Sequence, residues 1–255
     1  MNLQTCRLCG ANGQLRNSHI LPEFLYKENL YSEETKRLHI ISLGRREGPK
    51  VDFEQKGIRE RLFCQACETK LSRYEHHAAE AFFRNPDRTL IMHNLVEYQG
   101  LDFNKMRLFQ HSIVWRCAIA NHPLFSKIKL SNTHLRNLRR MIREEDPGEP
   151  EAYPLLVKED TSGFLDTFLG MPLLMQIRLK GKRFSRFVFP FANQIWFIDI
   201  DTDGTAVKGT SLEKAILRED GILMATRENF KETPFYHGLR KDFGALPQEL
   251  VDKIR

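Results

Sequence analysis

The chain has 255 residues, of which 41% are apolar and 28% are charged, and its formal net charge is only +6. Disordered chains combine low hydrophobicity with a large net charge, so this composition excludes a disordered protein and predicts one large or two modest domains. The longest apolar run, residues 187–192, is short and contains Pro190, so we expect no membrane span. The first residues carry no secretory signal, and we expect a cytoplasmic protein whose thiols stay reduced.

The first part of the chain, residues 1–95, contains four of the five cysteines. Residues 38–43, just before Gly44, predict one strand of a hairpin. A helix is expected after Cys67, because four apolar residues recur there at helical spacing: Leu71, Tyr74, Ala78 and Phe82.

The middle of the chain, residues 103–145, predicts two helices separated by residues 121–123. Ser131 or Asn132 can cap the second of these helices, which should run to about Glu145. In the last third, three segments have the pattern of strands: residues 173–180, 183–189 and 194–200.

The cysteines fall into two close pairs. Cys6 and Cys9 form one C-x2-C pair, and Cys64 and Cys67 form another, with 54 residues between the two pairs. Tetrahedral zinc takes four thiolates and each pair supplies two, so in a reducing compartment this pattern predicts a zinc site. The alternative is two pairs of reactive or merely buried cysteines. Cys117, inside an apolar helical run, is expected to be a buried thiol.

His19 follows the first cysteine pair by ten residues, in the sequence Ser18-His19-Ile20-Leu21-Pro22. A C-x2-C pair, a His-Ile-x-Pro string and a second C-x2-C pair before a helix, in this order, resemble the zinc-containing HNH endonucleases of the ββα-metal type. The resemblance covers about residues 4–85. It implies an α+β chain with a zinc-stapled, HNH-like nuclease module over residues 1–95. Residues 100–255 would then form a helical region and a small antiparallel β-sheet for substrate or partner contacts.

In that family a histidine is the general base that activates water against a phosphodiester bond, beside a divalent metal ion. The resemblance implies His19 as the base, Glu68 as a catalytic metal ligand, structural Zn2+ on the four cysteines and catalytic Mg2+ or Mn2+. The family's metal ligands are an Asp before the His and an Asn after the last Cys, where this chain has Ser18 and Glu68. Ser18 is a weak ligand and Glu68 a strong one, and Glu75 on the same helix face is a further candidate for magnesium. If Ser18 does not bind metal and Glu68 points away, the module is catalytically inactive.

Basic residues near these motifs are candidates for nucleic-acid contacts. Some lie between the cysteine pairs or just after them, and others recur on one face of the second middle helix. The alternative for that face is an ordinary solvated helix surface. The candidates are Arg45, Arg46, Arg59, Arg61, Lys70, Arg136, Arg139, Arg140 and Arg143.

We therefore expect a metal-dependent endonuclease that hydrolyses nucleic acid, DNA rather than RNA, with a role in defence against foreign DNA suggested by the class of enzyme it resembles. One alternative is a catalytically inactive zinc module that binds nucleic acid. Another is a zinc module whose residues 100–255 dock a partner protein, and a homo-oligomer stays open as well.

Overall fold

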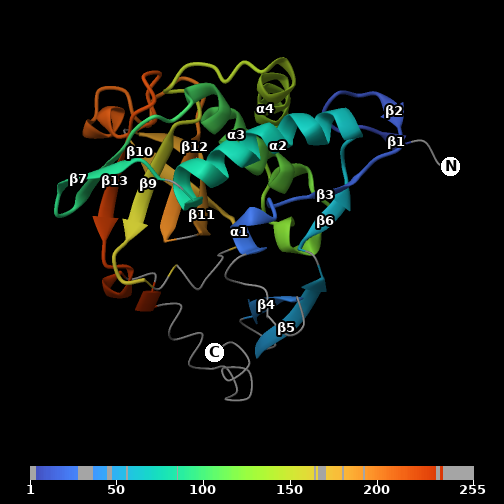
Figure 1. Ribbon diagram of the computed structural model, residues 1–255, viewed down its shortest axis with the longest axis horizontal. Coiled ribbons are helices and arrows are strands. Elements are labelled where there is room, and N and C mark those ends of the chain that lie inside the picture. The colour runs from blue at the N-terminus through green and yellow to red at the C-terminus, as the bar shows by residue number, and fades with distance from the viewer. Residues whose placement is uncertain are drawn as a thin grey trace.

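A computed structural model of the chain gives a mixed α/β structure (Figure 1). It describes residues 4–27, 37–44, 48–55, 57–84, 86–163, 165, 171–179, 181–191, 193–233 and 236–237. A large sheet lies at one end, the small hairpin β1–β2 lies at the other, and α2 runs between them (Figure 1).

Small two-stranded sheets occupy the first part of the chain. They are antiparallel and pair β1 with β2, β3 with β6 and β4 with β5. Their bounds are β1 Gln4–Thr5, β2 Asn12–Gly13, β3 Asn17–His19, β4 Arg37–Gly44, β5 Gly48–Gln55 and β6 Arg59–Arg61. The hairpin predicted before Gly44 is confirmed as β4–β5.

The helices follow the predicted pattern closely. Ser131 caps α4, because its hydroxyl accepts a hydrogen bond from the backbone N–H of His134, and Asp102 caps α3 in the same way through Lys105. The bounds are α1 Phe24–Lys27, α2 Gln65–Ala79 with a π-helical turn over Glu80–Arg84, α3 Phe103–Ile119 and α4 Asn132–Glu144. Short 3-10 turns cover Pro123–Phe125, Ser211–Lys214 and Phe230–Glu232.

The large sheet has seven strands in the order β10-β11-β12-β9-β13-β8-β7. Its neighbours are antiparallel except β13 and β9, which are parallel. The bounds are β7 Arg88–Met92, β8 Leu95–Tyr98, β9 Leu155–Asp160, β10 Leu173–Leu179, β11 Lys182–Phe191, β12 Gln194–Ile200 and β13 Leu223–Glu228. The sheet is therefore larger than the small antiparallel sheet expected from the sequence, and one of its strand pairs, β13 with β9, is parallel. Its extra strands come from segments far apart in the chain, whose pairing local patterns do not reveal.

The main core is built around α3. Its residues 106–117 are all buried, and it packs against both α2 and α4. The ring of Trp196 on β12 lies 5.3 Å from that of Phe82 and 5.8 Å from that of Phe109 on α3, which joins sheet and helices. One buried apolar cluster extends from Cys6 to Ala225. The division into units 1–95 and 100–255 stays a prediction.

Within the described part of the chain, no helix combines the length and the apolar character that crossing a bilayer requires.

Candidate metal centre and neighbouring polar cluster

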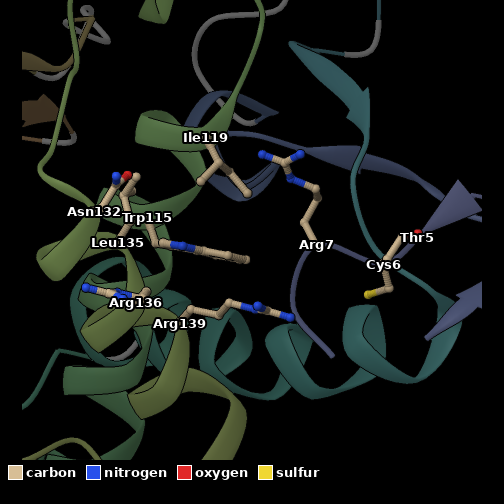
Figure 2. A pocket seen from close by; sticks show the side chains of 9 residues that line it. All are labelled: Thr5, Cys6, Arg7, Trp115, Ile119, Asn132, Leu135, Arg136 and Arg139. Carbon is tan, nitrogen blue, oxygen red and sulfur yellow. The ribbon is translucent and has the colours of Figure 1, made fainter. Parts of the chain in front are cut away.

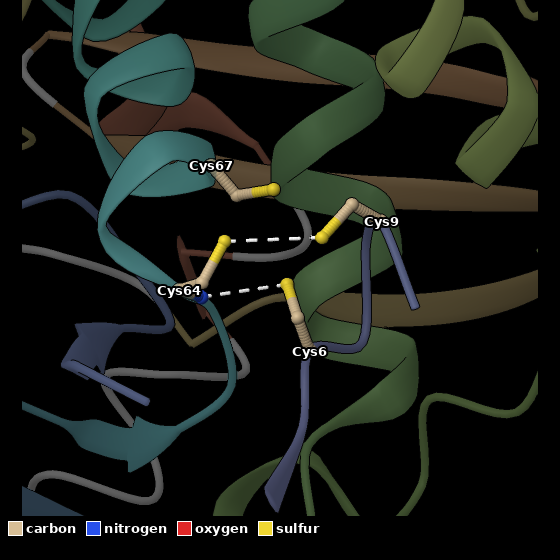
Figure 3. A group of neighbouring side chains, drawn as sticks. All are labelled: Cys6, Cys9, Cys64 and Cys67. Atoms are coloured by element: carbon tan, nitrogen blue, oxygen red, sulfur yellow. Dashed lines mark hydrogen bonds between the residues drawn. The ribbon is translucent and has the colours of Figure 1, made fainter. Parts of the chain in front are cut away.

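The four cysteines of the two pairs meet at one point (Figure 3). Cys6 and Cys9 lie on the turn between β1 and β2, while Cys64 and Cys67 lie at the start of α2. The turn closes through hydrogen bonds from Cys6 N to Ala11 O and from Gly10 N to Cys6 O, both 2.9 Å, and Gly10 has the positive φ that such a turn favours.

The sulfur geometry suits a tetrahedral metal ion. The four Sγ atoms lie within 4.8 Å of one another, and Cys9 Sγ is 3.8 Å from Cys64 Sγ. A tetrahedron with zinc–sulfur bonds of about 2.3 Å has edges of about 3.8 Å. The cluster could therefore hold a metal ion such as zinc.

Two of these buried thiols differ in how easily they ionise. Burial opposes ionisation of Cys6, but backbone hydrogen bonds, first that from Cys64 N over 3.4 Å, outweigh it and lower the pKa of Cys6 to about 7. Burial, followed by the neighbouring cysteine side chains, raises the pKa of Cys67. Cys6 is thus ready to ionise and Cys67 resists, and a bound cation would favour the thiolate of Cys67.

His19 ends β3, directly opposite Arg59 on β6. Because β6 precedes Cys64 by a few residues, this strand pair joins the segment of His19 to the segment that carries the second cysteine pair. Arg59 Nε donates a hydrogen bond to His19 Nε2 over 2.8 Å. An arginine is only a donor, so Nε2 of His19 is the acceptor here and the imidazole is neutral.

A buried arginine links His19 to α2. Arg116 on α3 donates through Nη1 to the backbone oxygen of His19 over 3.1 Å and to Glu75 Oε1 over 2.7 Å. It also contacts Ser112 within α3. Arg116 therefore ties α3, β3 and α2 together, and Glu75 is engaged as its counter-ion.

Glu68 and Ser18 lie in the same polar cluster. Burial raises the pKa of the Glu68 carboxyl, while the hydroxyl of Ser18 and the charge of Arg116 oppose that rise and Glu75 adds to it. Ser18 is itself buried. Glu68 Oε1 is buried and, within the described ranges, has no hydrogen-bond partner. A hard cation would supply such a partner, since Mg2+ is commonly held by one or two carboxylates, water and substrate phosphate. Among the described residues, however, only the four cysteines form a group of three or more His, Cys, Asp or Glu ligands close enough to hold an ion by themselves.

The basic candidates from the sequence take different positions. Arg45 and Arg46 lie outside the described residues, and Arg61 is exposed on β6. Three further candidates are paired with acidic residues near the end of α4. Lys70 contacts Arg143 O and Glu145, Arg140 pairs with Glu144 and Asp146, and Arg143 pairs with Glu144. The last two candidates, Arg136 and Arg139, line a cleft. The predicted basic stripe of α4 is therefore divided in two.

Sequence reasoning missed two arginines at these sites. Arg116 had a signal, because it is a charge inside the apolar run Val114-Trp115-Arg116-Cys117, where only a buried partner makes it tolerable. Arg7, between Cys6 and Cys9, lines the same cleft as Arg136, and no local pattern distinguishes it from a solvated arginine.

Comparisons with protein-family models, with curated proteins and with solved structures give no match to the chain. The resemblance to HNH endonucleases rests on its motif residues, and the function has to be argued from the chemistry of the cluster.

Proposed function

We propose that the protein is a metal-dependent endonuclease that hydrolyses phosphodiester bonds of nucleic acid, DNA rather than RNA, with His19 as general base. The observation that carries the proposal is the polar cluster beside the cysteines. It combines a part-buried histidine at a strand end with the carboxylate of Glu68, which interacts with the preceding strand residue, Ser18, and whose Oε1 is buried and unpartnered in the described structure.

In the proposed reaction, Nε2 of His19 takes a proton from a water molecule while the water oxygen forms a bond to phosphorus. The bond from phosphorus to the leaving sugar oxygen breaks, and that oxygen takes a proton from solvent. A Mg2+ or Mn2+ ion, when bound, would hold the scissile phosphate and stabilise the leaving oxygen. Glu68 Oε1 is the group that would hold it, with the Ser18 hydroxyl beside the carboxylate.

The four cysteines have a structural role in this proposal. Zinc on the cluster joins the β1–β2 turn to the start of α2, which carries Glu68 and Glu75. Because His19 and Glu68 lie on separate elements, their relative position depends on that junction.

The alternative is a catalytically inactive zinc module that binds nucleic acid or docks a partner protein. Two contacts favour it: Arg59 holds the accepting nitrogen of His19, and Arg116 engages Glu75. Both contacts engage the proposed catalytic side chains with protein groups, as expected of a cluster that stabilises the fold and has no catalytic activity.

The deciding experiment is nicking of supercoiled plasmid by the purified protein with Mg2+ or Mn2+. We expect His19→Ala to lower the rate by about 100-fold or more, the range that a general base contributes. His76→Ala is the matched control, since His76 is exposed on α2. Equal zinc content and melting temperature would show that the loss is chemical. Full activity in His19→Ala would exclude it as the base, and salt-sensitive binding without nicking by either protein would favour the alternative.

A further inference from the structure

A cleft of about 600 Å³ lies between the β1–β2 turn and α4, with α3 beneath it (Figure 2). Ligand pockets typically range from about 300 to 1,000 Å³, so the space suffices for one nucleotide. No acidic residue lines the cleft in the part of the chain that is described, whereas three arginines do: Arg7, Arg136 and Arg139.

One of these arginines is fixed in place. Arg139 Nε donates to Leu8 O over 2.8 Å, and its Nη2 lies 3.4 Å from the position that a Cβ on Gly10 would take. This guanidinium is thus laid along the β1–β2 turn, with its remaining N–H groups available. An arginine fixed before binding loses little side-chain entropy when an anion arrives.

Within the described ranges, the other two arginines have no ion-pair partner. Arg7 and Arg136 are exposed, and among the described residues neither forms an ion pair. By contrast, Arg140 and Arg143 on the same helix are paired with acidic residues of the C-terminal end of α4. The unneutralised charge of α4 is therefore concentrated at the cleft.

The floor of the cleft is apolar. Figure 2 shows the indole of Trp115 projecting toward the space between Arg7 and the arginines of α4, with Ile119 and Leu135 nearby. The Trp115 ring stacks on Phe63 at 5.8 Å and is itself almost fully buried, so it supports the floor from within, and the accessible apolar surface belongs to Ile119 and Leu135. An apolar surface beside several arginines suits a ligand that joins an apolar ring face to an anion.

We propose that this cleft binds a nucleotide through its terminal phosphate, with the phosphate among Arg7, Arg136 and Arg139 and the base on the apolar side formed by Ile119 and Leu135. A phosphate monoester carries about −1.5 to −2 charges at neutral pH and a backbone diester carries one, so three arginines that line one cleft favour the monoester. The ligand is the phosphorylated end of a nucleic-acid strand or a free nucleotide. The assignment of the ligand as a strand end rests on the proposed nuclease function. The inference that the cleft binds a phosphate monoester does not depend on that function.

The test measures binding without added Mg2+ to the full, zinc-loaded chain. The first pair of probes is an eight-nucleotide single strand with a 5′-phosphate and the same strand with a 5′-hydroxyl, and their binding is measured by fluorescence anisotropy. The second pair is deoxyadenosine monophosphate and deoxyadenosine, and their binding is measured by calorimetry. We expect the phosphate to tighten binding by about 10-fold or more in at least one pair, as a charge-assisted hydrogen bond does. Discrimination in the strand pair identifies a strand end, and discrimination in the nucleotide pair alone identifies a free nucleotide.

The variants separate the cleft from general electrostatic attraction. Arg7→Gln and Arg136→Gln should remove the preference for phosphate, whereas Arg140→Gln, which removes the same charge from α4 outside the cleft, should keep it. The inference is overturned if neither pair shows a phosphate preference, or if the preference persists in both cleft variants with unchanged melting temperature. A closed plasmid has no strand end, so nicking is read independently. Nicking without a preference for phosphate would overturn only the inference about the cleft. A preference for phosphate without nicking would overturn only the proposed nuclease function.

Discussion

Arg59 Nε donates a hydrogen bond to His19 Nε2 over 2.8 Å, across the pair of strands β3 and β6. The contact orients the imidazole, and it also occupies the lone pair that a general base needs. A phosphate is a stronger partner for a guanidinium than a neutral imidazole, because both groups carry charge. An arriving phosphate would therefore compete with Nε2 of His19 for the guanidinium of Arg59.

Replacing Arg59 by Met should separate its two roles, because Met keeps the length of the side chain but has no N–H donor. We expect KM for plasmid to rise by roughly 10-fold, since a charged contact to phosphate is lost. We expect kcat to be retained, because the hydrogen bond from residue 59 to Nε2 of His19 is removed. Arg61→Met is the matched control from the same strand, and its KM should change less. A loss of kcat as large as that of His19→Ala would instead mean that Arg59 serves to orient the base.

Glu68 and Glu75 lie on the same helix and should respond oppositely to replacement by Gln. Burial raises the pKa of Glu68, so at neutral pH its charge is held at a cost, and Glu68→Gln should raise the melting temperature while nicking is lost. Glu75→Gln removes the counter-ion of buried Arg116 and should destabilise the protein by about 1–3 kcal/mol. Thermal melting and nicking of both variants at pH 7 provide the check. Destabilisation by Glu68→Gln would contradict the assignment of its carboxylate as an unsatisfied group.

The parts of the site that the sequence predicts are those encoded locally. C-x2-C spacing brings two sulfurs to one turn, and a Ser before an amphipathic run caps a helix, as Ser131 does. The parts that it does not predict depend on contacts between distant segments. Arg116 meets the backbone of His19 across 97 positions of the chain, and Arg139 meets Leu8 across 131.

The same distinction explains the sheet. Strands β10 to β12 follow one another along the chain with clear turns, and their pattern predicts them. Strands β7 and β8 precede α3 in the chain, and the pairing of β8 with β13 extends the open sheet that contacts α3 through Trp196 and Phe109. Residues 106–117 of α3 are buried. A helix buried on nearly every side needs such a cover, but its amino-acid sequence does not say which strands provide it.

Removal of the metal should unfold the part of the chain that the cysteines join. If the cysteines hold zinc, its complete chelation would release the β1–β2 turn from α2, and Arg7 with it, since Arg7 lies between Cys6 and Cys9. Structural zinc sites contribute several kcal/mol to folding, so we expect the melting temperature to fall by roughly 10 °C or more. Zinc released on thiol modification should amount to one ion per chain, and Cys64→Ser should reproduce the loss. Unchanged melting after complete chelation would contradict a structural zinc.

Acid should destabilise the protein through its buried histidines. Burial lowers the pKa of His111 well below its usual value, aided by Arg107 and opposed by its hydrogen bond to Pro147 O. Burial also lowers the pKa of His77 and of His134. Below about pH 6.5 the unfolded chain therefore binds protons that the folded chain does not, and stability falls by up to about 1.4 kcal/mol per pH unit for each such histidine.

His111→Gln isolates one of these histidines from the other effects of acid. Glutamine can still donate to Pro147 O but does not titrate, so the variant should lose less melting temperature between pH 6.5 and pH 5 than the parent protein. Protonation of the cysteine ligands also destabilises the fold in acid, but it acts equally on both proteins and cancels in the difference. His76→Gln, at an exposed position of α2, should leave the slope unchanged. Equal pH dependence of the melting temperature in His111→Gln and its parent would contradict the lowered pKa of His111. It would mean that folded His111 takes up a proton as readily as the unfolded chain does, despite its burial and the nearby charge of Arg107.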